Sequence, residues 1–193
     1  MSKKKISPEA QAIVSASDAG LHATTASLAT KFLINNPTSQ RAWLDLGHAL
    51  GQLSRYAEAQ EAFEKAIELA DGDPCDVIFG EIGNLYRAKG DFETAKSWFQ
   101  KQIDADPGDA TGYLFLGNTL LRQGSFDQAI EVLSGGLDCE QGCLEEIHFS
   151  IGLALRGKGD LIESKKHFQL AIEMDEKFAA AKTALKDVKS ASV

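Results

Sequence analysis

The sequence predicts an all-α solenoid of antiparallel helix pairs that ends in a C-terminal capping helix. A glycine recurs at residues 47, 83, 117 and 152, with spacings of 36, 34 and 35 residues. Large apolar residues follow each glycine by nine and by sixteen positions, and a small residue follows it by twelve. Self-similarity at a nearly constant period of this length is the signature of a repeat array. The apolar residues lie at helical rather than strand spacing, which predicts two helices in each repeat.

We expect residues 1–6 to form a flexible tail and residues 7–36 to form a degenerate helix pair. Ser7 followed by Pro8 is a typical helix start, with Ser as N-cap and Pro in the first turn. The second helix should carry its apolar stripe on Leu21, Thr25, Leu28 and Phe32 and end near Asn36 and Pro37.

Four registered repeats are predicted over residues 39–175, at about 40–73, 76–109, 110–144 and 145–178. Positions are counted here from residues 40, 76, 110 and 145, so that each recurrent glycine is position 8. This glycine and the small residue at position 20 should let the two helices of a pair approach closely. Gly90, Gly124 and Gly159 suit the left-handed residue that ends the first helix of a pair. The small residues at position 20 are Ala59, Ala95, Ala129 and Ser164, and the large residues at position 24 are Phe63, Phe99, Leu133 and Phe168.

A single capping helix is expected at residues 177–190, continuous with the repeats in one domain. Its apolar stripe consists of Phe178, Ala181, Leu185 and Val188. Lys182, Lys186 and Lys189 should keep the outer face hydrated, as the end of a repeat array requires.

These motifs resemble those of the tetratricopeptide repeat family. The repeats read "WLDLGHAL" with "AQEAF", "FGEIGNLY" with "AKSWF", "YLFLGNTL" with "AIEVL", and "HFSIGLAL" with "SKKHF". The resemblance implies a right-handed superhelix whose first helices line a concave, peptide-binding groove. His148 departs from the family by replacing the aromatic of the fourth repeat, and Gln102 and Gly136 replace a small residue. The carboxylate clamp of chaperone-binding members would need Lys and Asn where this chain has Leu44 and His48, so a chaperone-tail partner is not expected.

Helix geometry leaves positions 2, 5, 9, 12 and 13 of each first helix on a stripe away from the packed face. Asparagine is a mediocre helix residue, and its amide can bond both the C=O and the N–H of a peptide backbone. Groove asparagines of the family often hold a ligand in this way, so Asn84 and Asn118 are the leading candidates. Arginines on the stripe could bind acidic side chains or a C-terminal carboxylate, or could equally be ordinary surface charge. The expected peptide-binding residues are Asn84, Asn118, Arg87, Arg122, Arg156, Leu44, His48, Leu114 and Phe149.

Composition excludes several other classes of function. A net charge of −8 and a pI near 5.0 give no general attraction to nucleic acid or anionic membranes. The chain also has no run of roughly 18 apolar residues, so we expect a cytoplasmic protein. Cys139, Cys143 and His148 lie close in sequence and allow a metal site, but reduced loop thiols are the simpler interpretation of a chain whose only other cysteine is Cys75. We expect neither cofactor nor catalysis, because we find no phosphate loop, metal cluster or nucleophile elbow.

The predicted function is therefore a non-catalytic scaffold that binds an extended or helical, possibly acidic, peptide segment of a partner protein in its groove. Two alternatives remain open. The chain could be a small acidic chaperone for a secreted or assembling client, or it could bind another copy of itself.

Overall fold

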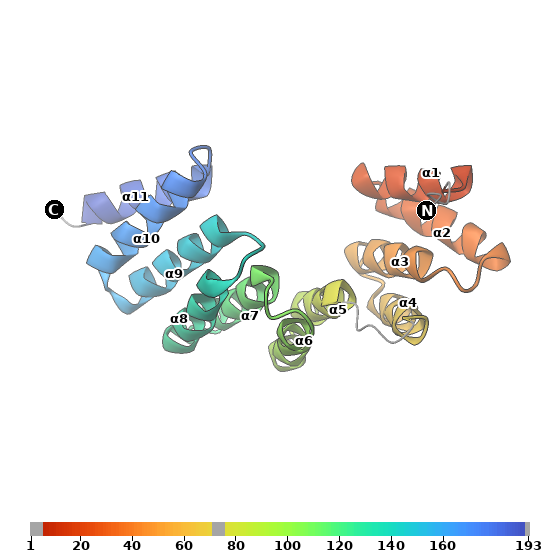
Figure 1. Ribbon diagram of the computed structural model, residues 1–193, viewed down its shortest axis with the longest axis horizontal. Coiled ribbons are helices and arrows are strands. Elements are labelled where there is room, and N and C mark those ends of the chain that lie inside the picture. Colours follow the sequence, from red (N-terminus) through yellow and green to blue (C-terminus); the bar gives the residue numbers. More distant parts are fainter. Residues whose placement is uncertain (1–5, 71–75, 192–193) are drawn as a thin grey trace. The chain divides into compact units, whose positions relative to one another are not determined.

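The computed structural model describes residues 6–70 and 76–191, and eleven α-helices make up most of this part of the chain (Figure 1). The all-α prediction is confirmed. The helices fall into two compact units, residues 1–91 (unit 1) and residues 92–193 (unit 2). Within the described residues, no helix is both long and apolar enough to cross a membrane.

Unit 1 stacks its helices in chain order. They are α1 (Pro8–Asp18), α2 (His22–Asn35), α3 (Gln40–Gln52), α4 (Tyr56–Glu68) and α5 (Asp76–Ala88). Each helix packs on the next, and α3 also packs on α1 and on α5. The first helices of consecutive pairs therefore lie side by side.

Unit 2 follows the same rule. It contains α6 (Phe92–Ala105), α7 (Ala110–Arg122), α8 (Phe126–Gly135), a short 3₁₀ helix η1 (Gly136–Asp138), α9 (Leu144–Lys158), α10 (Leu161–Met174) and α11 (Ala179–Ala191). Consecutive helices pack together, and the first helices α7 and α9 are also in contact.

The recurrent glycine brings the two helices of a pair into contact. A Cβ atom built on Gly47 would lie 2.7 Å from the ring of Phe63, and one on Gly152 would lie 2.6 Å from the ring of Phe168. At Gly117 the same atom would overlap Leu133. In all three pairs, position 8 of the first helix receives the large side chain from position 24 of the second helix.

The small residue at position 20 is fully buried in every repeat, as predicted. The alanines at 59, 95 and 129 and the serine at 164 have no exposed surface. The hydroxyl of Ser164 donates a hydrogen bond of 2.8 Å to the carbonyl oxygen of Gly152, so its polar atom is satisfied inside the pair.

The turn inside each pair requires a left-handed residue at position 15. Gly90, Gly124 and Gly159 have φ values of 81°, 74° and 85°. In the first repeat the same position is Ser54, with a φ of 60°. A side chain in this conformation costs free energy that glycine avoids.

The degenerate N-terminal pair exists, and Thr25 of the predicted α2 stripe is buried, but the stripe is wrong at Leu21. The helix buries Thr25, Ala26, Ala29 and Leu33, whereas Leu21 precedes the helix and is 54% exposed. The buried face is rotated because α2 packs between α1 and α3, and it includes the small residues Ala26 and Ala29.

The capping helix α11 is also present. Ala181, Ala184 and Val188 are buried, and the last two form a cluster with Phe168 of α10. The side chains of Lys182, Lys186 and Lys189 are exposed, as predicted for the outer face of a cap.

We expect Gly47→Ala to be less stable than Gly51→Ala by about 1–3 kcal/mol, because the added methyl of the first overlaps the Phe63 ring. Both glycines lie in α3, so both variants gain the same helix propensity. A Cβ on Gly51 would meet only a methyl of Leu85, at 3.3 Å. Urea denaturation of both variants measures the difference, and equal stabilities would contradict the packing role of Gly47.

We expect Ser54→Gly to raise the free energy of unfolding by about 0.5–1 kcal/mol, since the left-handed strain it removes exceeds the entropy that glycine adds to the unfolded chain. The reciprocal change Gly124→Ser, at the same position of a later repeat, should destabilise. Thermal denaturation of the two variants tests this, and a loss of stability in Ser54→Gly would show that Ser54 makes a compensating interaction.

Candidate binding site

The first-helix face of unit 1 carries an ion pair between neighbouring repeats. His48 Nδ1 on α3 lies 2.8 Å from Glu81 Oε2 on α5, and both side chains are partly exposed. The hydrogen bond to Glu81 raises the pKa of His48 above its ordinary value of 6.5. The pair is therefore more completely charged near neutral pH than a free histidine would be.

Two small hollows adjoin this pair. One, of about 170 Å³, is lined by Leu44, Val77 and the aliphatic and charged groups around them. The other, of about 80 Å³, is lined by the small residues Gly47, Gly51 and Ala88 together with larger side chains such as Phe63 and Leu85. His48 and Glu81 line both hollows, so the ion pair lies between them.

The charges beside the larger hollow are already compensated. The carboxylate of Asp45 is almost fully buried, and Arg41 Nε lies 3.0 Å from each of its oxygens. A buried carboxylate without such a partner would be costly. The main role of Arg41 is therefore to neutralise Asp45, although much of the Arg41 side chain stays exposed.

Asn84, at position 9 of the second repeat, lines the smaller hollow. Its Oδ1 accepts a hydrogen bond of 2.7 Å from Nη2 of Arg87, one turn further along α5. Asn84 and Arg87 are thus coupled to each other. The amide still has two N–H groups to donate, so Asn84 is better suited to bind a carbonyl oxygen than an N–H group.

Asn118 occupies position 9 on the first-helix face of unit 2. Its Oδ1 accepts a hydrogen bond of 2.8 Å from the buried hydroxyl of Ser150 on α9. This bond spans 32 residues and the His48–Glu81 pair spans 33, so both join position 9 of one repeat to position 6 of the next. Position 9 therefore contributes to the contact between repeats, a role that the sequence analysis did not anticipate.

The predicted exposed apolar stripe is wrong at Leu114, which is only 2% exposed. The first helix α7 has helical neighbours besides its pair partner, including α9, so position 5 turns inward. Phe149 is half-buried, and its ring centroid lies 5.7 Å from that of Phe168 and 5.1 Å from that of Phe178. In contrast, Leu44 lines a hollow open to solvent.

The three predicted arginines have different surroundings. The Arg122 guanidinium lies 5.2 Å from the ring centroid of Phe92, at the start of α6. A Cβ on Gly157, at the same position of the next repeat, would meet Phe126 at the start of α8. In unit 2, position 13 thus contacts the second helix of the preceding repeat, whereas Gln52 and Ala88, at position 13 of the first two repeats, line the smaller hollow. The Arg122 side chain is exposed, and its contact with a ligand stays a prediction. Arg156 is exposed on α9.

Two histidines meet inside the last repeat. His148 on α9 and His167 on α10 have Nδ1 atoms 3.1 Å apart, and burial lowers the pKa of both. His148 was expected to pack in the place of the missing aromatic, but its partner was not predicted. His148 and His167 are positions 4 and 23 of their repeat, and the same positions of the first repeat, Trp43 and Ala62, line one pocket. This spacing was the available signal.

The two described cysteines lie in the loop before α9. Burial, reinforced by Glu146, raises the pKa of Cys143 to about 11, and burial also raises that of Cys139. Both are free thiols. No group of three or more His, Cys, Asp or Glu side chains in residues 6–70 and 76–191 is placed to hold a metal ion. Cys75 lies outside the described residues.

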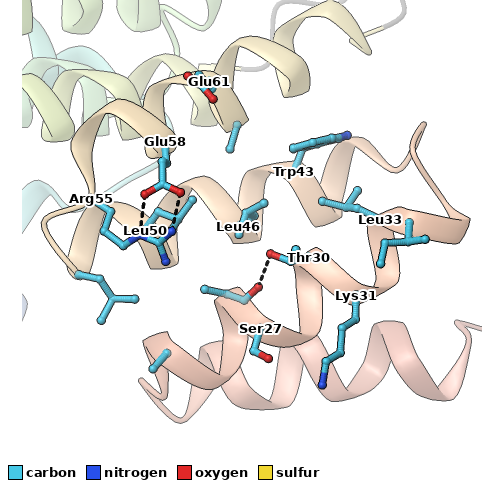
Figure 2. Close-up of a pocket in the computed structure, with 15 residues that line it drawn as sticks. Ser27, Thr30, Lys31, Leu33, Trp43, Leu46, Leu50, Arg55, Glu58 and Glu61 are labelled. Atoms are coloured by element: carbon cyan, nitrogen blue, oxygen red, sulfur yellow. Dashed lines mark hydrogen bonds and ion pairs between the residues drawn. The ribbon is translucent and has the colours of Figure 1, made fainter.

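A larger groove opens between α2 and α4, and we call it the α2–α4 groove. Its volume is about 790 Å³, and Figure 2 shows side chains of α2, α3 and α4 lining it. Leu33, Leu46 and Leu50 form its apolar floor, and Ile34 at its edge is 75% exposed. Trp43 also lines it, with its indole N–H bonded to the carbonyl of Pro37.

Stacked helix pairs with recurrent close contacts define a helical-repeat scaffold. A tetratricopeptide repeat model matches residues 40–73 and 145–178, and a second model of the same description matches residues 86–148. These matches cover more than half of the chain. The chain belongs to the tetratricopeptide repeat family and has the architecture of a protein–protein interaction scaffold.

Among curated proteins, the chain is similar to DnaJ homolog subfamily C member 7 of Mus musculus and of Homo sapiens. Each match is 32% identical over 114 residues and covers 56% of this chain but 22% of the relative. The chain therefore spans about a fifth of the length of these relatives.

Solved structures of similar fold include MamA, YrrB and a Thermus thermophilus protein. The MamA structure has a TM-score of 0.67 at 24% identity and covers 89% of this chain and 92% of its own. YrrB, described as a TPR protein with an unusual peptide-binding site, has a TM-score of 0.65 at 17% identity, covering 90% and 88%. The thermophilic TPR protein TTC0263 of Thermus thermophilus has a TM-score of 0.71 at 19% identity, covering 93% and 96%. At these identities the likeness concerns the fold.

The His148–His167 pair predicts a loss of stability in mild acid. Burial holds the folded pKa of each below 6.5, so the unfolded chain takes up protons first as the pH falls through that value. We expect the free energy of unfolding of the wild type, relative to that of His167→Gln, to fall as the pH is lowered from about 7.5 to about 5.5. Urea denaturation across this range measures it.

His48 gives the matched control, because its folded pKa is raised rather than lowered. The stabilisation from its pair with Glu81 is complete below pH 6.5 and is lost as the pH rises through the folded pKa. The advantage of wild type over His48→Gln should therefore shrink in the opposite direction, with rising pH. If the stability difference between wild type and variant changed with pH in the same direction for both histidines, the assigned environments would be contradicted.

Proposed function

We propose that the first-helix face of unit 1 binds an extended segment of a partner protein across the His48–Glu81 pair. The observation that carries this proposal is the pair itself, flanked by two hollows on adjoining first helices. Alternate side chains of an extended peptide point to the same side, so one peptide can fill a hollow and pass over the pair.

The chemistry of each hollow suggests what it would receive. The one beside Leu44 and the half-exposed Val77 suits an apolar side chain. The one beside Asn84 has little room for a side chain, so it suits the peptide backbone, with a carbonyl oxygen accepting a proton from the amide.

The corresponding face of unit 2 is proposed as a separate contact. Asn118 keeps its amide protons after bonding Ser150, and Arg156 on α9 is exposed. An acidic side chain in a partner segment would find a bidentate donor at Arg156. Arg87 would act mainly by orienting Asn84.

Selection of random displayed peptides on the immobilised full chain tests the unit 1 proposal without a known partner. We expect Asn84→Ala to weaken a selected peptide by about 0.5–1.5 kcal/mol, the value of one hydrogen bond, when measured by fluorescence polarisation. Val77→Lys should weaken it further by placing a charge in the apolar hollow. Thermal melting of both variants separates lost binding from lost folding.

Asn35→Ala is the matched control, because Asn35 is an exposed asparagine at the end of α2 that lines neither hollow. It should bind the selected peptide like the wild type. The proposal fails if Asn84→Ala and Asn35→Ala bind equally well, or if selection returns no peptide that the first-helix face of unit 1 recognises.

A further inference from the structure

We propose that the α2–α4 groove of one copy receives the outer face of α10 from a second copy of this chain. This interaction is independent of the peptide site, because the groove is lined by α2, α3 and α4 and includes neither His48 nor Glu81. It assigns an occupant to a cavity of about 790 Å³.

The groove has the properties of a helix-binding surface. Its leucine floor lies between two helices of 14 and 13 residues, so an amphipathic helix could lie along it. Ile34 and Leu53 leave apolar surface exposed at its edges, with 75% and 38% of each residue accessible. Exposed apolar surface around a concave groove of this kind usually marks an interaction site.

The chain also contains a helix with the complementary feature. The exposed large hydrophobic residues among the described part of unit 2 are Ile162, Leu170 and Met174, at 73%, 39% and 51%, and all three lie on α10. Their spacing of eight and four residues places them within one sector of the helix surface. At 14 residues, α10 also matches the length of the helices that border the groove.

Charges on the two surfaces are complementary as well. Lys31 of α2 and Glu61 of α4 line the groove on opposite walls, while Arg55 and Glu58 pair with each other (Figure 2). Among residues 6–70 and 76–191, neither Lys31 nor Glu61 has a hydrogen-bonding or ionic side-chain partner. The exposed charges of α10 include Glu173 and Lys165, besides Lys166, which pairs with Glu163 on the same helix. Each side can therefore satisfy a charge that the other leaves unpaired.

Such a contact is heterologous, because the groove and the helix are different surfaces of one chain. Each copy in contact with a second copy still has one free groove and one free helix face. Assembly therefore continues head to tail, or closes into a ring if the geometry permits.

Sedimentation velocity of the full chain from about 1 μM to about 1 mM tests the proposal, since weak assemblies dissociate within this range. We expect the average mass of the wild type to rise with concentration. Ile34→Glu, which changes the groove, and the double variant Ile162→Lys, Met174→Lys, which changes the helix face, should each stay monomeric. Leu21→Glu changes an apolar residue outside the groove that is 54% exposed, and this variant should assemble like the wild type.

Mixing the two monomeric variants gives the sharpest test. One retains a working helix face and the other a working groove, so the mixture should form a one-to-one dimer and nothing larger. Circular dichroism confirms that each variant is folded, and Leu53→Glu provides a second groove variant. The proposal is overturned by a wild type that stays monomeric throughout, by a mixture that forms no dimer, or by assembly that survives either variant.

Discussion

The contact between the glycine at position 8 and the large side chain at position 24 is the constraint on which the rest of the structure depends. Phe63 and Phe168 lie where a Cβ atom would otherwise stand on Gly47 and Gly152. Because the ring occupies that space, the two helices of a pair approach closely and their relative rotation is fixed. That rotation determines which side chains of the first helix meet a neighbouring repeat and which meet solvent.

The same packing gives unit 1 two different surfaces. First helices lie against one another and present polar groups, with the His48–Glu81 pair between two small recesses. Between the second helices α2 and α4, a larger apolar groove opens over the side of α3 that carries the buried Leu46 and Leu50. One surface suits the directional bonds of a peptide backbone, and the other suits the burial of apolar side chains.

The sequence predicted the pairs, their turns and their close contacts, because each depends on a few residues near in sequence, such as Gly152 with Phe168. It did not predict the burial of Leu114 or the rotated face of α2. A helical wheel describes one partner, whereas a helix within an array packs on several neighbours at once. The His148–His167 contact was missed for a related reason: each position was read by itself, so the spacing that brings positions 4 and 23 together was not used.

The polar bonds between consecutive first helices have a consequence for how such an array can evolve or be rebuilt. His48 is matched to Glu81, and Asn118 to Ser150, so in the first and third repeats the residue at position 9 suits a particular residue at position 6 of the following repeat. Exchanging, deleting or duplicating a repeat would leave a partly buried polar group facing an unsuited neighbour. The repeats share one backbone design, but these two matched pairs make the junctions at which they occur specific to their neighbours.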